Sequence, residues 1–305
     1  MSSTRTVAAL LEDKATPPAL RARLELARSV RDYASRELKL PDNGSYRSYA
    51  DIGRPYAVWN VVAAPEFSLE PIKSCFPVAG CVNYRGFFSQ EAADRYAGKL
   101  KAEGNDVFVY GVAAYSTLGR FDDPLLSSFI RYPDAELARL LFHELAHQVA
   151  YVQDDSTFNE SFAVTVEREG VKRWLAATHR PDQLAAFLDR QRRNEAFMAI
   201  LEDSRRRLRA LYTAPLAPEA ARARKKQEMQ ALAARLKAYP RFAGFEPNNA
   251  LLASFATYTK LVPGFEKLLA VEGGNLPRFY ERVKALARDK ARPELPGGED
   301  AARAS

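Results

Sequence analysis

The segment HELAH, from His143 to His147, constrains this chain more than any other stretch of its sequence. On a helix, residues four apart project from one face, so the two imidazoles would lie about one turn apart. At that spacing both rings can reach one zinc ion at about 2.0–2.1 Å. The flanking residues Leu141, Phe142 and Leu145 are apolar, which predicts burial, and a buried polar group without a partner costs ~2–7 kcal/mol. A metal ion would supply that partner.

Glu144 lies beside the first histidine and is suited to act as a general base. It would take a proton from a zinc-activated water as that water attacks a carbonyl. The whole chain has three His residues, and two of them are in this motif. The alternative is an amphipathic helix with two exposed His residues, but the apolar surroundings argue against it. The motif therefore predicts a zinc-dependent hydrolase.

A catalytic zinc site needs a third protein ligand and an open fourth position. His179 is expected at the far end of the next helix, so a carboxylate is favoured as the third ligand. Two of the nearby Asp residues fall in a DDST turn, where turn formation and capping explain them. Glu160 and Glu167 are seven apart on one predicted helix face, and geometry alone does not choose between them. The full set of candidates is Asp154, Asp155, Glu160, Glu167 and Glu169.

Hydrophobic periodicity predicts an α+β fold, with a small sheet lobe packed on a largely helical lobe. The first lobe, 1–132, is expected to hold helices at 17–37 and 89–104 and strands at 56–64, 81–88 and 105–116, in a mixed or antiparallel sheet. The second lobe, 133–305, is expected to hold helices at 134–152, 156–178, 182–212 and 217–238, two short helices within 247–273, and the zinc site. Alternatively, the two lobes form one integrated catalytic domain.

The formal net charge of +7 would suit an acidic partner such as nucleic acid. However, basic and acidic residues alternate on the predicted helix faces, as in 190–209, and no nucleic-acid-binding motif is present. We therefore expect no nucleic-acid partner. No apolar run reaches membrane-spanning length, and the N-terminus has no signal-peptide core. The protein is expected either to be cytoplasmic or to be exported by a segment that has been removed.

Cys75 and Cys81 flank a short segment that contains Pro and Gly. Such a loop can bring two Cα atoms within disulfide range, which favours a disulfide over two separate buried thiols. A structural disulfide would indicate an oxidising compartment.

The substrate side of the site is less constrained by sequence. Residues 109–119 are a candidate strand for pairing with a peptide backbone, which would place Tyr115 and Ser116 next to the substrate. An ordinary sheet strand is the equal alternative. Tyr115, Tyr258 and His179 are candidate donors to the developing oxyanion. Asn249, with Asn248, could bind a substrate backbone, although helix capping after Pro247 also explains both.

The segments HELAHQ and NESFAVTVE together are similar to the gluzincin metallopeptidases, most closely to the aminopeptidase N type. This resemblance implies that Glu160 is the third zinc ligand and that Glu167 and Asn159 support the ligands. The chain departs from that pattern in a shorter spacer before Glu160 and in Ser161, which replaces the usual Gly. It also lacks the Gly-x-Met-Glu-Asn motif with which those exopeptidases hold the substrate amine.

The whole chain resembles a bacterial family of predicted zinc aminopeptidases. The resemblance is carried by stretches such as CFPVAGCVNYRGFF, VAAYSTLGRFDDPLLSSF and LLFHELAHQ. It implies a zinc metallopeptidase that removes N-terminal residues from peptides. It also implies a periplasmic or cell-envelope location, a lipid anchor in the precursor, and the Cys75–Cys81 disulfide. The alternatives are a zinc endopeptidase and a non-catalytic, zinc-stapled envelope binding protein. Glu144 argues against the latter, because a structural site needs no base.

Overall fold

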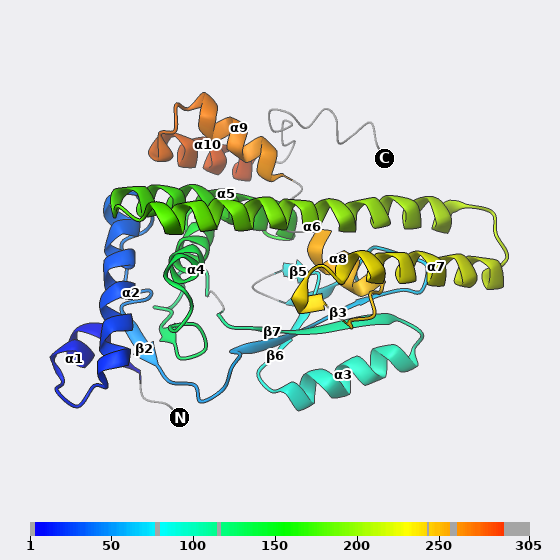
Figure 1. Cartoon of the computed structure of the whole chain (residues 1–305), viewed down its shortest axis with the longest axis horizontal. Coiled ribbons are helices and arrows are strands. Elements are labelled where there is room, and N and C mark those ends of the chain that lie inside the picture. Colours follow the sequence, from blue (N-terminus) through cyan, green and yellow to red (C-terminus); the bar gives the residue numbers. More distant parts are fainter. Residues whose placement is uncertain (1–3, 77–79, 115–116, 243, 257–260, 290–305) are drawn as a thin grey trace. The chain divides into compact units, whose positions relative to one another are not determined.

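The computed structural model describes residues 4–289, except 77–79, 115–116, 243 and 257–260 (Figure 1). Helices and short strands are mixed along the chain, which confirms the predicted α+β class. The chain divides into two compact units: the first comprises Met1–Val58, Gly111–Phe187 and Tyr258–Ser305, and the second comprises Trp59–Tyr110 and Leu188–Thr257. Each unit therefore combines segments from both sides of residue 132.

The first unit begins with β1 (Arg5–Thr6), α1 (Val7–Glu12) and α2 (Pro18–Arg36). The last of these matches the predicted helix at 17–37, and Pro18 suits its first turn because that position needs no intrahelical N–H bond. The strand β2 (Ser48–Ala50) pairs antiparallel with β1 and parallel with β8 (Leu125–Leu126). These strands were not predicted, because two or three residues are too few to show alternation.

The centre of the first unit is a helical hairpin of α4 (Asp134–His147) and α5 (Ser156–Ala177). The two helices approach closely at Gly170, where a Cβ atom would lie 2.8 Å from side-chain atoms of Leu38 and Phe142. The sequence predicted that the first helix continues to about residue 152. That prediction is wrong, because the chain leaves the helix after His147.

Two further helices of the first unit, α9 (Val262–Val271) and α10 (Leu276–Arg288), complete the core around α5. An aromatic cluster joins these helices: the ring centroids of Phe162 and Phe265 lie 5.9 Å apart, as do those of Phe162 and Phe279. Helix α10 was not predicted. Its first turn is capped by Asn275, whose side chain accepts a hydrogen bond from the Arg278 N–H.

The second unit contains a sheet in the order β6-β3-β7, formed by β6 (Arg85–Phe87), β3 (Val58–Ala64) and β7 (Asp106–Val112). Helix α3 (Gln90–Ala102) packs on this sheet through Ala93, Ala97 and Leu100. The predicted strand at 81–88 is interrupted, since β4 (Ser74–Phe76) and β5 (Gly80–Val82) form a separate hairpin. Cys75 and Cys81 face each other across this hairpin and are joined by a disulfide.

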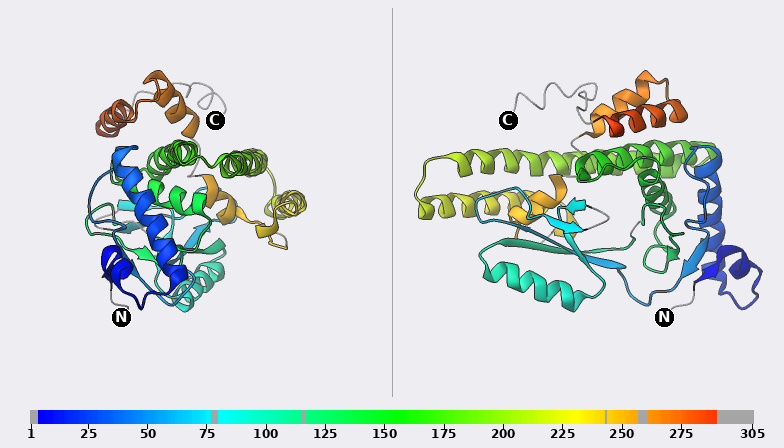
Figure 2. Two further views of the ribbon diagram at one scale, coloured as in Figure 1. Left: turned by 60° about the vertical axis from the view of Figure 1, so that its left-hand side comes forward. Right: turned by 180° about the vertical axis from the view of Figure 1, so that it is seen from behind.

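The remaining helices of the second unit are α7 (Pro218–Leu236), α8 (Asn249–Ala256) and the larger part of α6 (Pro181–Thr213). Figure 2 shows α6 and α7 lying side by side as an antiparallel pair. Leu208, Leu232 and Leu236 are buried in their shared core. Among the residues that the structure describes, no helix is both long enough and apolar enough to span a membrane.

Candidate metal centre

The last two turns of α4 present His143 and His147 on one face of the helix. Their Nε2 atoms lie 3.1 Å apart, and the two rings meet edge to face. The returning helix α5 brings Glu160 to the same point, with a carboxylate oxygen 3.3 Å from Nε2 of His143 and another 3.8 Å from Nε2 of His147. These three residues thus form a group that could hold a metal ion.

The separations between these atoms fit a single shared ion. Tetrahedral ligands at about 2.0–2.1 Å from a metal lie about 3.3 Å from one another. The two histidine Nε2 atoms lie 3.1 Å apart, Oε2 of Glu160 lies 3.3 Å from Nε2 of His143, and Oε1 of Glu160 lies 3.8 Å from Nε2 of His147. One ligand atom from each residue can be chosen so that all three lie within 4.8 Å of one another. Two facing imidazole nitrogens and a carboxylate are also chemically matched to a divalent transition metal, because all three can donate an electron pair toward the same point.

Asn159 determines where the returning helix places Glu160. Its side-chain amide donates to the Val152 carbonyl at 2.8 Å and accepts from the Val152 N–H at 2.8 Å. Asp155 caps the start of α5 by accepting a hydrogen bond from the Phe158 N–H at 2.8 Å. The turn after His147 is therefore fixed from both sides, and Glu160 arrives level with the two histidines.

Glu167 supports the site from behind His143. Its Oε2 atom lies 2.9 Å from Nδ1 of His143, and because a carboxylate only accepts, the imidazole donates this bond. The bond fixes the tautomer that leaves Nε2 free to bind a metal. Arg139 donates to the same Oε2 atom at 2.9 Å and to Oε2 of Glu136 at 2.9 Å. Sequence reasoning did not identify Arg139, although it stands one turn before His143.

His147 has no comparable support. Its Nδ1 atom is buried and has no hydrogen-bond partner within the described part of the chain. Packing therefore holds this ring, and burial lowers the pKa of His147 to about 4. A neutral imidazole at neutral pH is the form that binds a metal.

The acidic residues of the site have shifted pKa values with opposite signs. Burial raises the pKa of Glu144 to about 7; the nearby His143 opposes this shift, whereas the charges of Glu160 and Asp123 add to it. Burial also acts to raise the pKa of Glu160, but the two histidines outweigh it and lower the value. A carboxyl group that titrates near neutral pH is suited to accept and return a proton.

Without a metal, the pKa of His143 shifts in the opposite direction from that of His147. Burial acts to lower the pKa of His143, but hydrogen bonds and charges from Glu160 and Glu167 outweigh burial and raise it well above its usual value. Burial also acts to raise the pKa of Glu167, but Arg139 and His143 lower it. A metal ion would therefore displace a proton from His143 on binding.

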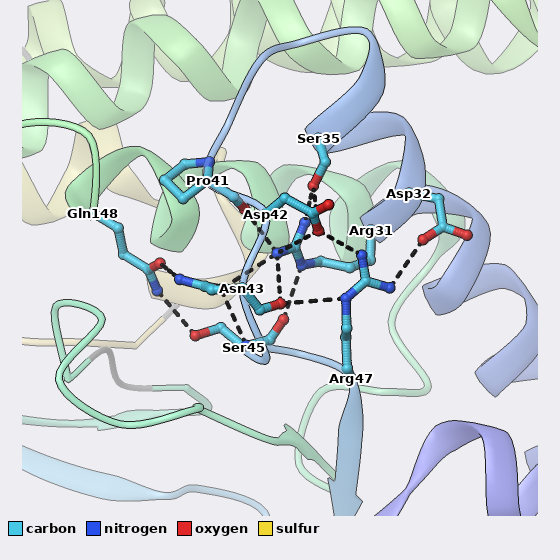
Figure 3. A network of polar contacts seen from close by, with 9 residues as sticks. All are labelled: Arg31, Asp32, Ser35, Pro41, Asp42, Asn43, Ser45, Arg47 and Gln148. Carbon is cyan, nitrogen blue, oxygen red and sulfur yellow. Dashed lines mark hydrogen bonds and ion pairs between the residues drawn. The ribbon is translucent and has the colours of Figure 1, made fainter.

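A polar network fixes the loop before β2 against the end of α4 (Figure 3). Gln148, directly after the second histidine, accepts a hydrogen bond from Asn43 at 2.7 Å and donates one to the Ser45 hydroxyl at 3.2 Å. Arg31 is fully buried and donates to the main-chain oxygens of Ser45, Pro41 and Asn43 at 2.8, 2.8 and 3.1 Å. This network was not found from the sequence, because Gln148 lies about a hundred residues after Asn43 and Ser45 in the chain.

The sequence also proposed residues outside the group of His143, His147 and Glu160. Tyr115, Ser116 and Tyr258 lie outside the described residues. Asn249 belongs to the second unit, where its buried amide accepts from the Tyr212 hydroxyl and donates to the main-chain oxygens of Pro65 and Glu66. His179 is exposed beyond the C-terminal end of α5, whereas Glu160 lies near the start of that helix. His179 therefore does not serve as an oxyanion donor.

The other candidate ligands have separate explanations. Asp155 caps α5, and Asp154 occupies a left-handed position in the turn, with φ of 65°. Glu169 forms an ion pair with Arg173 at 2.7 Å. Within the described residues, the structure brings Glu160 together with both histidines.

The model of the family described as "Putative aminopeptidase" matches residues 1–295. No curated protein matches the chain, and no solved structure does.

Proposed function

Because this chain belongs to the family described as "Putative aminopeptidase", we propose that it is a zinc-dependent metallopeptidase that removes N-terminal residues from peptides. The observation that carries this proposal is the convergence of His143, His147 and Glu160 in α4 and α5, with Glu144 beside them. Peptide-bond hydrolysis by this route needs three protein ligands, one open position and one base. The site supplies the ligands and the base.

Each protein residue then has a defined task. A zinc ion held by the three ligands would polarise the scissile carbonyl and lower the pKa of a water molecule. Glu144 would take the proton from that water and return it to the leaving amine. Glu167 keeps His143 in the ligand tautomer, and Arg139 holds Glu167 in place.

Two alternatives remain distinct from this proposal. A zinc endopeptidase would use the same ligands and base but would not need a free substrate amine. A non-catalytic envelope protein would use zinc only to staple α4 to α5. Glu144 argues against the second alternative, because burying a carboxylate there is costly and a purely structural site gains nothing from it.

We further propose that the protein is located in the periplasm or cell envelope and that its precursor carries a lipid anchor. The Cys75–Cys81 disulfide supports this location, because structural disulfides persist in oxidising compartments. A cytoplasmic location is the alternative. Separating the cytoplasmic and envelope fractions of the cell would show which of them holds the protein. Measuring its free thiols under alkylating conditions would show whether Cys75 and Cys81 are paired there, as the envelope location predicts.

The test of the proposed activity is the substitution Glu144→Gln in the zinc-loaded protein. We expect turnover of a peptide panel to fall by about 10²–10⁴-fold, the usual contribution of a positioned base, while one zinc per chain is retained. Glu169→Gln is the matched control, because it makes the same change on α5 outside the site. Unchanged turnover in Glu144→Gln with zinc bound would overturn the hydrolase proposal.

A further inference from the structure

His147 is the last residue of α4, whereas His143 lies one turn inside the helix. The final carbonyl groups of a helix have no partner within it, so its end is the part that frays most readily. A side-chain partner usually restrains a metal-binding imidazole, as Glu167 does for His143. Within the described residues, Nδ1 of His147 has no such partner. The position of this ring therefore depends on how the chain is held directly after it.

Gln148, the residue directly after His147, is held by hydrogen bonds to two other side chains (Figure 3). Its Oε1 atom accepts from the Asn43 amide at 2.7 Å, and its Nε2 atom donates to the Ser45 hydroxyl at 3.2 Å. Gln148 also caps α4, because its N–H donates to the Leu145 main-chain oxygen at 3.1 Å. The same residue thus closes the last turn of the helix and joins it to the loop before β2.

The loop that holds Gln148 is itself fixed by Arg31, which belongs to α2 and is fully buried. The Arg31 Nε atom donates to the Ser45 main-chain oxygen at 2.8 Å. Its Nη2 atom donates to the main-chain oxygens of Pro41 and Asn43 at 2.8 and 3.1 Å. A guanidinium group holds its donors in a rigid plane, so it can bind several carbonyl oxygens at fixed angles. The two residues that bind Gln148 are therefore fixed through their own backbone.

The surroundings of Arg31 favour a positioning role over a role in stability. Its ion pair with Asp42 is long, at 4.0 Å, and the Asp42 side chain is exposed. Neutral oxygens are therefore the main partners of a buried charge. Burying a charge costs folding free energy, and apolar side chains of similar volume often give a fold that is equally stable. Arg31 thus adds little stability that apolar packing could not supply, whereas it defines the geometry of the loop.

We propose that Gln148 is a positioning residue for His147, and that the loop held by Arg31 provides its anchor. The two candidate histidine ligands are then oriented in different ways. His143 is oriented through its ring by Glu167, and His147 through its backbone by the residue that follows it. Such preorganisation strengthens metal binding, because the ligand does not have to be immobilised when the ion arrives. This inference rests on the proposed function, since it assigns a task at the same metal centre.

A purely structural role for Gln148 makes a different prediction. If its hydrogen bonds only stabilise the fold, their loss would lower the free energy of unfolding and leave the metal affinity of the folded molecules unchanged. If they position His147, the folded protein would bind zinc more weakly and in a different geometry. Co²⁺ in place of zinc reports this geometry through its visible absorption spectrum. Affinity and spectrum, measured on folded protein, therefore separate the two roles.

The variant Gln148→Met keeps the length of the side chain but removes both hydrogen bonds. We expect its zinc affinity, measured by competition with a chromophoric chelator, to fall by about 10-fold, with a changed Co²⁺ spectrum. Gln148→Glu is the conservative variant, because a carboxylate can accept from both the Asn43 amide and the Ser45 hydroxyl. We expect its affinity to be no more than about 3-fold below that of the wild type. Gln153→Met is the matched control, because it makes the same replacement at an exposed position in the turn after α4.

Ser45→Ala tests the same link from the other side. It removes the acceptor of the Gln148 amide but leaves the Ser45 main-chain oxygen bound to Arg31. We expect zinc affinity to fall by about 3-fold, with no further loss when Ser45→Ala is added to Gln148→Met. Because Ser45→Ala is the smaller change, it carries the test if Gln148→Met does not fold. Additive losses in the double variant would show that the two residues do not act together.

A measurement on the metal-free protein tests the positioning without zinc. Hydrogen exchange followed by mass spectrometry would report on the last turn of α4, where the Val149 N–H donates to the Ala146 main-chain oxygen at 2.9 Å. We expect this turn to exchange about 10-fold faster in Gln148→Met than in the wild type or in Gln153→Met, with exchange in α5 unchanged.

The inference is overturned if Gln148→Met binds zinc as tightly as the wild type, if Gln148→Glu loses affinity to the same extent, or if Gln153→Met has an equal effect. Its failure and that of the proposed function are distinguishable. A wild type that binds no zinc contradicts the proposed function, and hydrogen exchange then still decides whether Gln148 holds the end of α4. A wild type that binds zinc and is unaffected by Gln148→Met contradicts the positioning role alone.

Discussion

His143 and Glu167 are joined by a hydrogen bond of 2.9 Å from Nδ1 of the imidazole to Oε2 of the carboxylate. They come from two different helices, α4 and α5, so the bond couples the orientation of a candidate metal ligand to the packing of the hairpin. Arg139 completes this arrangement by donating to the same oxygen. The hydrogen bonds that Arg139 and His143 both donate to Glu167 direct the Nε2 lone pair of the histidine toward Glu160.

Removing the acceptor should weaken metal binding without removing a ligand. For Glu167→Ala we expect zinc affinity to fall by about 10–100-fold, the usual effect of losing such a partner. Competition with a chromophoric chelator measures this change directly, and Glu169→Ala serves as the control on the same helix. An unchanged affinity in Glu167→Ala would show that packing alone orients His143.

Arg139 should stabilise the fold through its hydrogen bond to Glu167. In Arg139→Gln the Glu167 carboxylate loses a charge-assisted hydrogen bond in a largely buried position, so we expect the free energy of unfolding to fall by about 1–3 kcal/mol. Urea denaturation of the metal-free protein measures this loss. The exposed Arg192, replaced in the same way, should give a change of less than about 0.5 kcal/mol. Equal effects at both positions would contradict the role given to Arg139.

The clamp between Asn159 and Val152 should control the position of Glu160. In Asn159→Ala both Val152 backbone groups lose their buried partner, at about 1–3 kcal/mol for each unsatisfied group. We expect a lower unfolding midpoint in urea together with weaker zinc binding, because the turn no longer places Glu160 level with the histidines. Normal zinc affinity in a destabilised variant would mean that the turn is set by other contacts.

The pH dependence of stability provides a further test at Glu144. Its folded pKa is raised to about 7, above its ordinary value of 4.5, so folding disfavours the ionised carboxylate. Below about pH 4.5 the carboxyl group is protonated in both the folded and the unfolded state, so it does not change the free energy of unfolding. Between about pH 4.5 and 7 the unfolded chain ionises first, and the metal-free protein loses stability as pH rises.

Glu144→Gln removes this titration. In the presence of a chelator, we expect the variant to be more stable than the wild type at pH 8, by up to about 3 kcal/mol, and the two to be similar at pH 4. Thermal or urea denaturation at both pH values measures the difference. A stabilisation that is the same at pH 4 and pH 8 would show that the Glu144 carboxylate carries no burial penalty.

The sequence predicted the fold class and the long helices well, because apolar periodicity over many residues is a strong signal. It placed the end of the first site helix about five residues too far along, however. The side chain of Asn159 binds the backbone of Val152, and such a tertiary contact leaves no trace in periodicity. The choice between Glu160 and Glu167 depends on where that helix ends, which is why local pattern left both open.

The supporting residues were harder to find for a related reason. The network of Arg31, Asn43 and Ser45 includes Gln148, which lies about a hundred residues further along the chain, and each residue type is common on surfaces. Arg139 was the exception, because its position one turn before His143 on the same helix could have indicated it.

The central claim is that His143, His147 and Glu160 together bind zinc. A crystal structure of the zinc-loaded protein tests it most directly. We predict one zinc ion within about 2.0–2.2 Å of Nε2 of each histidine and of a Glu160 carboxylate oxygen, with Glu167 still bound to Nδ1 of His143. A zinc ion bound by Glu167 in place of Glu160, or by Nδ1 of either histidine, would contradict the account.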